Sequence, residues 1–248
     1  MKKRSTRQAR PRPDYGIDAP RTVRNLFLAG ACALAAGLSV PVFHAGGLRI
    51  YLAGPTLLAL GSLSLGLCAS MLAYSLLGKF NIRDRMLGAI RWRGDETVLD
   101  IGTGQGLLAV GAAKRLRNGT VTALDNWDVP ACSSNNFELA QRNAELEGVQ
   151  DRLELRSGDA CNIGFVDNSF DVVLCLLGLS ALDSDGRDLA CKEIARVLKP
   201  RGMAVVGERP DISGYMRAFS AAGLSVKRPE PCTLRAFTSM AIVIARKR

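Results

Sequence analysis

Three glycines at alternate positions follow a short apolar run in this chain, and an aspartate ends the next apolar run. The glycines are Gly102, Gly104 and Gly106, the first run is 98–101, and the aspartate is Asp125. Glycines let backbone amides approach a ligand closely, and a carboxylate at the end of the second strand accepts hydrogen bonds from both hydroxyls of a ribose. The pattern predicts a nucleoside site at the edge of a parallel sheet, with a ligand-free strand-to-helix turn as the plainer alternative.

The glycine spacing argues against two common nucleotide-binding loops. A dinucleotide fingerprint, G-x-G-x-x-G, needs its third glycine where this chain has Leu107. A P-loop needs Lys-Ser or Lys-Thr after its last glycine, and neither pair follows here. The loop is therefore typical of neither dinucleotide nor nucleoside-triphosphate sites.

Further short motifs follow in chain order: Thr122-Ala123-Leu124-Asp125, Ser157-Gly158-Asp159-Ala160, Asp167-Asn168-Ser169-Phe170-Asp171-Val172-Val173 and Arg196-Val197-Leu198-Lys199-Pro200-Arg201-Gly202. Together with the Asp-x-Gly-x-Gly-x-Gly motif at 100–106, they make residues 95–248 resemble class I S-adenosylmethionine-dependent methyltransferases. The resemblance is closest to the methyltransferase type 11 group, which includes the ubiquinone and menaquinone biosynthesis methyltransferases.

The resemblance implies an α/β fold, a Rossmann-like sheet of seven strands with helices on both faces, and S-adenosylmethionine as the cofactor. The apolar runs and their punctuation predict strands at 97–101, 120–124, 152–157, 170–175 and 203–208, and helices at 106–117, 133–147, 185–198 and 212–222. Two more strands, 224–228 and 239–245, follow without a helix between them. In the family they form an antiparallel hairpin whose last strand inserts into the sheet.

The resemblance also assigns cofactor-binding residues. Asp100 is expected at the ammonium of the methionine moiety, unless it only caps the next helix, and Asp125 is expected at the ribose. Trp127 is expected against the adenine or in ordinary packing, and Asp159 at the adenine amino group or in a solvated turn. The full expected set is Asp100, Gly102, Thr103, Gly104, Gly106, Asp125, Asn126, Trp127, Asp159, Ala160 and Cys175.

No residue stands out as the base that would remove a proton from the acceptor. Related quinone and lipid methyltransferases often place a histidine after the fourth strand, where this chain has Ser180. The only histidine, His44, lies between two apolar spans. Glu208 and Asp183 are candidate bases and Tyr215 is a weaker one; otherwise the acceptor is itself acidic or nucleophilic, and positioning is sufficient.

Two apolar spans precede this domain. Residues 26–43 and 50–77 carry no charged side chain, and about 20 helical residues cross a bilayer core of about 30 Å. They predict a transmembrane helical hairpin over residues 25–78. A cleaved signal peptide would need a cleavage site, and a soluble hairpin would need a charged face. Two stripes of small residues suit close helix packing: Ala29, Ala33 and Gly37, and Ser62, Gly66 and Ser70.

The net charge of +10 is concentrated around these spans. The tail 1–24 carries eight Lys or Arg and two Asp, residues 79–93 carry five Lys or Arg and one Asp, and residues 94–248 are nearly neutral. A nearly neutral domain argues against nucleic acid as a partner. By the positive-inside rule, the basic tail 1–24 and the catalytic domain 94–248 face the cytoplasm from a two-span cell-membrane anchor. The segment 79–93 is either a juxtamembrane linker or helix on anionic headgroups, or the first helix of the domain.

These features predict a membrane-anchored methyltransferase that acts on a small molecule or lipid. The seven cysteines never form a C-x-x-C pair, which favours reduced thiols over disulfides or a metal site. Two alternatives stay open. One is a sensor or scaffold that binds S-adenosylmethionine without turnover, which the Ser180 departure favours. The other is a protein methyltransferase that acts on a membrane neighbour.

Overall fold

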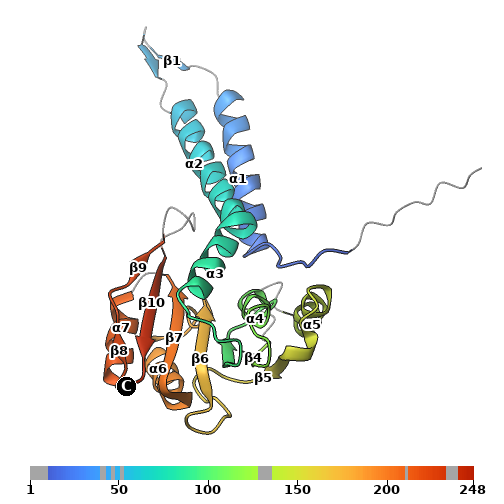
Figure 1. The fold of residues 1–248 in the computed structure, drawn as a ribbon. Coiled ribbons are helices and arrows are strands. Elements are labelled where there is room, and N and C mark those ends of the chain that lie inside the picture. The colour runs from blue at the N-terminus through green and yellow to red at the C-terminus, as the bar shows by residue number, and fades with distance from the viewer. Residues whose placement is uncertain are drawn as a thin grey trace, which may run out of the picture.

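The structure, a computed structural model, consists of an α/β domain and a helical hairpin that projects from it (Figure 1). It describes residues 11–39, 43–45, 48–50, 53–127, 136–209, 212–232 and 240–248. Expectations for residues 128–135 and 233–239, such as the start of the helix 133–147, lie outside the described residues.

The domain is built on one large sheet. Its strands are β3 (Thr97–Ile101), β4 (Thr120–Asp125), β5 (Leu153–Ser157), β6 (Phe170–Leu176), β7 (Leu198–Glu208), β8 (Ser225–Val226), β9 (Glu230–Pro231) and β10 (Ala241–Arg246). They lie in the order β5-β4-β3-β6-β7-β10-β8, with β9 also paired to β10. β3 to β7 are parallel to one another, and β10 is antiparallel to β7. The strand order reverses direction between β3 and β6, which is where open α/β sheets bind ligands.

The sheet has eight strands, so the expectation of seven is corrected. The expected strand 224–228 is shortened to β8, and a further short strand, β9, follows it; the two pair with β10 at different places. Pro229 lies between them, and proline has no N–H to donate to a strand ladder. The insertion of the final strand β10 beside β7 is as the family resemblance implied.

Helices cover both faces of the sheet. They are α3 (Lys79–Gly88), α4 (Leu107–Ala113), α5 (Phe137–Leu146), α6 (Ser184–Val197) and α7 (Ile212–Ala221). Because successive strand residues point to opposite faces, Val172 and Leu174 of β6 join a core cluster with α3 and α4, whereas Val173 and Cys175 join one with α6 and α7. This two-sided burial explains why β6 is apolar at all but one of its positions.

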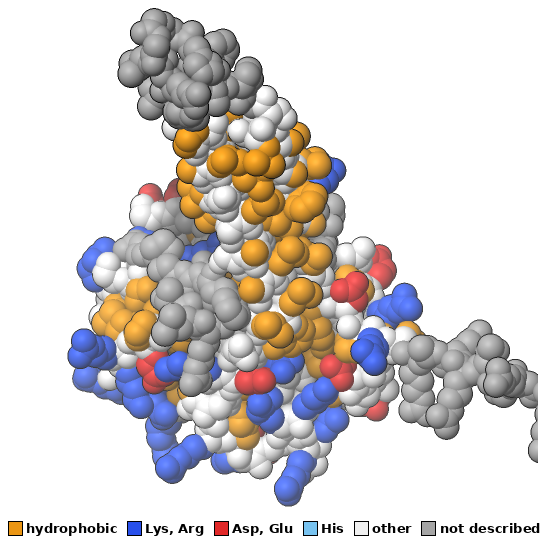
Figure 2. Space-filling view, turned by 90° about the horizontal axis from the view of Figure 1, so that it is seen from above, with side chains coloured by type: hydrophobic (Ala, Val, Ile, Leu, Met, Phe, Trp, Pro, Cys, Tyr) orange, Lys and Arg blue, Asp and Glu red, His pale blue; other side chains and the backbone are white. Residues whose placement is uncertain are grey.

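The hairpin consists of α1 (Pro20–Ser39) and α2 (Ala53–Ala73), and the short strands β1 (Phe43–Ala45) and β2 (Leu48–Ile50) lie between them. α2 continues through a π-helical turn, Tyr74–Gly78, directly into α3. Both α1 and the continuous helix Ala53–Gly88 are long and apolar enough to cross a membrane. Their outer faces expose large apolar side chains, including Leu38, Leu60 and Leu63. Figure 2 shows apolar side chains along the hairpin, whereas Lys and Arg gather around the domain.

Glycines let the two hairpin helices approach closely. A Cβ added to Gly30 would lie 3.1 Å from the carbonyl oxygen of Gly61, and one added to Gly37 would lie 3.1 Å from that of Gly54. The expected stripes are corrected in part. Gly37 is in this contact, but a Cβ on Gly66 would meet nothing within 4 Å, because that residue faces outward.

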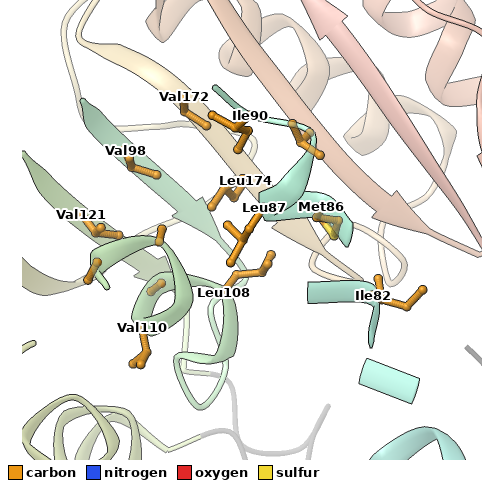
Figure 3. Close-up of a cluster of buried hydrophobic side chains, with 14 of the residues drawn as sticks. Ile82, Met86, Leu87, Ile90, Val98, Leu108, Val110, Val121, Val172 and Leu174 are labelled. Carbon is orange, nitrogen blue, oxygen red and sulfur yellow. The ribbon is translucent and has the colours of Figure 1, made fainter. Parts of the chain in front are cut away.

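α3 is a core element of the domain, an arrangement that fits the expected first helix of the domain. Ile82, Met86 and Leu87 are fully buried and pack against side chains of the sheet and of α4 (Figure 3). A Cβ on Gly111 of α4 would lie 2.6 Å from Cδ1 of Leu87, so the two helices are in close contact. The hairpin is therefore fixed to the sheet through α3.

Replacing Leu87 with alanine should lower the free energy of unfolding by about 2–5 kcal/mol, because it leaves a cavity in a closed core. The measurement is guanidinium unfolding of the full chain in detergent, followed by tryptophan fluorescence; Nε1 of Trp92 donates to the carbonyl of Leu87 at 2.9 Å. Leu189→Ala is the matched control, since Leu189 is 50% exposed on α6. Equal losses in the two variants would contradict the role assigned to α3.

Candidate functional site

A cavity of about 390 Å³ opens at the carboxyl ends of β3, β4 and β6, at the topological switch point of the sheet. Its volume is that of a small-molecule site. Eight of the expected cofactor residues line it: Asp100, Gly102, Thr103, Gly104, Asp125, Asn126, Asp159 and Ala160. The other three, Gly106, Trp127 and Cys175, are not among its lining residues.

The three positions of the loop require or tolerate glycine for different structural reasons. All have positive φ, at 66°, 55° and 83° for Gly102, Gly104 and Gly106, a region that favours glycine. A Cβ on Gly102 would lie 2.4 Å from Cα of Gly178, so this glycine lets the loops after β3 and β6 touch. A Cβ on Gly104 would meet nothing within 4 Å. Gly104 is thus the position where the backbone faces open space in the cavity.

Asp100 both supports the loop and keeps one oxygen for a ligand. Its Oδ2 accepts hydrogen bonds from Oγ1 of Thr103 at 2.7 Å and from the N–H of Ala109 at 3.0 Å, near the start of α4. Its Oδ1 is buried and has no hydrogen-bond partner among the described residues. Burial raises the pKa of this carboxyl to about 7, although the two hydrogen bonds favour its ionised form. A cationic hydrogen-bond donor placed beside Oδ1 would give this oxygen a partner.

Asp125 ends β4 and organises the neighbouring loop. Its Oδ2 accepts from the N–H of Gly104 at 2.9 Å, and its Oδ1 accepts from the N–H of Trp127 at 3.0 Å. The carboxylate is buried to 7% exposure, yet it lines the cavity beside Asn126. The ring of Trp127 packs edge-on against Phe137, with centroids 5.3 Å apart, which is the packing alternative expected for it.

Asp159 lies in the loop after β5 with a turn of its own. Its Oδ1 accepts from the N–H of Cys161 at 2.9 Å. Its side chain is exposed and it lines the cavity together with Ala160. The loop thus combines the two expected features, a solvated turn and a place at the cavity wall.

Glu208, a candidate base, lies behind the cavity wall. Its Oε1 accepts from the N–H of Leu179 at 2.9 Å and from the Sγ–H of Cys175 at 3.9 Å, and its Oε2 has no partner among the described residues. Burial raises the pKa of Glu208 to about 7 and the pKa of the Cys175 thiol well above its usual value. Neither residue lines the cavity. The carboxyl of Glu208 instead holds the loop after β6 through the N–H of Leu179.

The other two candidate bases are also used in the fold. Asp183 caps α6, with Oδ1 accepting from the N–H of Gly186 at 2.8 Å. Tyr215 is buried on α7 with the guanidinium of Arg187 5.6 Å from its ring centroid, and burial raises its pKa. Neither lines the cavity. Ser180 does, and its Oγ donates to the carbonyl of Leu177 at 3.0 Å.

Four lining residues that precede the glycine loop by more than twenty positions were missed by sequence reasoning. Tyr15 and Asp18 come from the segment before α1, and Tyr74 and Lys79 come from the base of the hairpin. Within the basic tail, Tyr15 is the only aromatic residue, and Asp18 is one of only two acidic ones. That local departure in composition was the available signal.

The charge of the cavity favours a cationic ligand. Its ionisable lining side chains are four carboxyls, of Asp18, Asp100, Asp125 and Asp159, and the ammonium of Lys79. Nζ of Lys79 lies 3.1 Å from Oδ2 of Asp18, so those two charges offset each other and the remainder is negative. Among the described residues, no group of three or more His, Cys, Asp or Glu is placed to hold a metal ion, and the six described cysteines are free thiols.

Comparison with known proteins bears on the segment that carries this cavity. Residues 98–202 match the family described as "Methyltransferase domain". Over 132 residues the chain is 35% identical to a demethylmenaquinone methyltransferase of Lactiplantibacillus plantarum, which covers 52% of this chain and 52% of that protein. The chain spans about half the length of the curated relatives it matches.

Two solved structures share the fold. An S-adenosylmethionine-dependent methyltransferase from Methanosarcina mazei has a TM-score of 0.53 and 18% identity, over 66% of this chain and 96% of that one. Geranyl diphosphate C-methyltransferase from Streptomyces coelicolor, solved with S-adenosyl-L-homocysteine, has a TM-score of 0.57 and 14% identity, over 68% of this chain and 81% of that one. Residues 98–202 are therefore similar to methyltransferase domains, and the domain shares its fold with S-adenosylmethionine-dependent methyltransferases.

Proposed function

We propose that this protein is a membrane-anchored enzyme that transfers a methyl group from S-adenosylmethionine to a small, lipophilic acceptor. One observation carries the proposal. Tyr74 and Lys79, at the base of the apolar hairpin, line the same cavity as Gly104 and Asp125. A bilayer around the hairpin would therefore lie close to the cavity. The basic residues on both flanks of the hairpin support a cell membrane with the domain on its cytoplasmic side.

The cavity offers a partner to each part of the cofactor. When bound, S-adenosylmethionine supplies a methyl group on a positively charged sulfur. Asp100, through its unpartnered Oδ1, suits the ammonium of the methionine moiety, and the backbone of Gly104 faces open space. Asp125 would accept from the ribose hydroxyls, since each carboxylate oxygen has further lone pairs. Asp159 and the amide of Ala160 would hold the adenine.

The remaining wall suits an apolar acceptor. The end of β6 and the loop after it contribute Leu176, Leu177 and Leu182, and the hairpin base contributes the ring of Tyr74. Apolar walls exclude water and bind apolar molecules. A relative named as acting on demethylmenaquinone supports a small-molecule acceptor.

The placement of the three candidate bases favours catalysis by positioning. Glu208, Asp183 and Tyr215 are hydrogen-bonded or packed outside the cavity lining. In-line transfer from an activated donor needs reactants held close and water excluded. The acceptor is then an acidic or intrinsically nucleophilic group. The same placement supports the second candidate function, a sensor or scaffold that binds the cofactor without turnover.

Methyl-labelled S-adenosylmethionine distinguishes the proposals. Membranes that contain the full chain are incubated with the labelled donor, and lipid is then separated from protein. Label in the lipid fraction supports the proposed function, and label in polypeptide supports a protein methyltransferase. Binding without transfer to either fraction supports the sensor or scaffold. Membranes that contain Asp125→Ala serve as the background.

Replacing Asp125 with alanine should weaken S-adenosylhomocysteine binding about tenfold or more, because charged hydrogen-bond acceptors to the ribose and to the loop are lost. Isothermal titration calorimetry of the full chain in detergent measures the change. Asp188→Ala is the control, since Asp188 is 54% exposed on α6. An unchanged dissociation constant for Asp125→Ala would refute its assignment.

The affinity for S-adenosylhomocysteine should fall as the pH is lowered through about 7. Asp100 has a raised pKa near that value in the free protein, and the ligand's ammonium favours the ionised carboxylate. Below the raised pKa the carboxylate must lose a proton before it binds, so affinity falls by up to about tenfold per pH unit. Titrations between about pH 5.5 and 7 keep the α-amino group protonated. Asp100→Asn should bind more weakly and lose this slope; an equal slope in both proteins would contradict the assignment.

Charged side chains introduced by substitution on the outer face of α2 should release the protein from the membrane. Leu60 and Leu63 are each 61% exposed, and each charge near the centre of a spanning helix costs roughly 2.5–3.5 kcal/mol on insertion. The protein should resist a carbonate wash of membranes, and the double variant Leu60→Glu, Leu63→Glu should appear in the wash. Leu189→Glu should stay with the membrane. Release of the unaltered chain by carbonate would refute the anchor while leaving the cofactor site untouched.

A further inference from the structure

Residues 14–18, which we call the strap, form one wall of the cavity. Tyr15 and Asp18 line it together with the glycine loop. The Tyr15 side chain is buried and packs edge-on against Phe80 of α3, with ring centroids 5.8 Å apart. Its hydroxyl donates to Oε1 of Glu147, just after α5, at 3.4 Å. The strap therefore bridges the hairpin base and the domain.

Asn143 of α5 joins the strap to the glycine loop. Its Oδ1 accepts from the N–H of Asp14 at 2.8 Å, and its Nδ2 donates to the carbonyls of Asp14 at 2.7 Å and of Gln105 at 3.0 Å. Its side chain is fully buried, and a buried amide with three partners is held firmly. The strap backbone also packs against the side chain of Gln105, since a Cβ added to Gly16 would lie 2.5 Å from Nε2 of Gln105. Strap and loop positions are thus coupled.

Lys79 fastens the strap to the hairpin base. Its Nζ donates to the carbonyls of Tyr15 at 2.5 Å and Gly16 at 2.6 Å, and to Oδ2 of Asp18 at 3.1 Å. The side chain is only 5% exposed, and a buried ammonium is stable only when its three N–H groups are satisfied. The N–H of Asp18 also donates to Oγ of Ser75 at 2.9 Å. Lys79 is therefore occupied by the strap.

We propose that the strap closes the cofactor site and that Lys79 is the positioning residue that keeps it closed, so that the cofactor and its product leave only when the strap is released. The identity of the ligand rests on the proposed function. Only Ala19 separates the strap from α1, and α1 packs on α2 through Gly30 and Gly37. The hairpin thus holds the strap at its far end as well, and the membrane anchor and the cofactor site share one closing element.

Replacing Lys79 with methionine should raise the dissociation rate constant of S-adenosylhomocysteine about tenfold or more, because three acceptors of the strap lose their donor. The measurement is surface plasmon resonance on the full chain in lipid nanodiscs, with S-adenosylhomocysteine as analyte. The matched control is Lys199→Met. Lys199 makes an ion pair with Asp171 at 2.8 Å near the amino ends of β6 and β7. The control should lower the melting temperature and leave the dissociation rate unchanged.

A dissociation rate for folded Lys79→Met equal to that of the unaltered protein would overturn the proposal. Should that variant fail to fold, hydrogen exchange of the unaltered chain decides. The amides of Gly16 and Asp18, which donate to Oδ1 of Asp14 and Oγ of Ser75, should exchange more slowly with S-adenosylhomocysteine bound. Exchange unaffected by ligand would overturn it equally. If the unaltered chain does not bind S-adenosylhomocysteine at all, the proposed function itself fails; normal binding with a ligand-independent strap removes only this inference.

Discussion

The packing of α3 against the sheet is the interaction on which the other features depend. The helix that begins at Ala53 in the hairpin runs without a break to Gly88 in the domain core. Its first part exposes apolar side chains, whereas Ile82, Met86 and Leu87 in its last part are buried in the domain core. Since one helix serves both parts, burial of those three side chains fixes the direction in which the hairpin leaves the domain. The π-helical turn at Tyr74–Gly78 lies at the change between the two environments, and such turns are frequent at functional sites.

The connection between α2 and α3 at residues 74–79, which we call the joint, also completes the cavity. A sheet with its glycine loop and Asp125 supplies only one side of a ligand site, at the carboxyl ends of the strands. The second side comes from Tyr74 and Lys79 at the joint and from the strap that Lys79 holds. Burying the ammonium of Lys79 is unfavourable unless the strap supplies acceptors. The strap is thus required by the chemistry of the joint itself.

Some residues of the sequence motifs stabilise the edge of the sheet opposite the cavity. Asp171 accepts from the N–H of Thr97 and from Nζ of Lys199, which joins the starts of three strands; the Lys199 hydrogen bond contributes to holding its pKa below the usual value. Arg196 donates to Glu193 and to the carbonyl of Ile163, which fixes the loop before β6. These motif residues therefore hold the starts of the strands and the loop before β6 in place.

Local patterns predicted the parts of the structure that depend on neighbouring residues. The apolar run before Gly102 became β3, the run that ends at Asp125 became β4, and eight of eleven expected cofactor residues line the cavity. Long-range contacts were not accessible in this way. Asn143 reads as a polar residue on an amphipathic helix, and nothing near it in sequence indicates that it binds Asp14. Likewise Glu208 reads as a carboxylate at a strand end, but its burial behind Leu179 depends on how the next loop folds over it.

The separation of β9 from β8 has a local cause, Pro229, which lies just after the expected strand 224–228. The contact between the missed residues Tyr15 and Lys79, by contrast, has no local cause in the sequence. They meet because a tail that precedes the hairpin returns to the end of the hairpin's second helix, which is a property of the whole topology.

Tyr74, at the base of the hairpin, lines the cavity on the side where we propose that the acceptor binds. Photocrosslinking from p-benzoylphenylalanine in place of Tyr74 tests this proposal most directly, in membranes that contain the full chain and S-adenosylhomocysteine. The account predicts a discrete adduct of one small lipophilic species, identified by mass spectrometry and absent when the same probe replaces Leu189 on α6. Adducts only to peptide, or the mixture of bulk lipids that a probe at the outward-facing Leu76 would give, would contradict it.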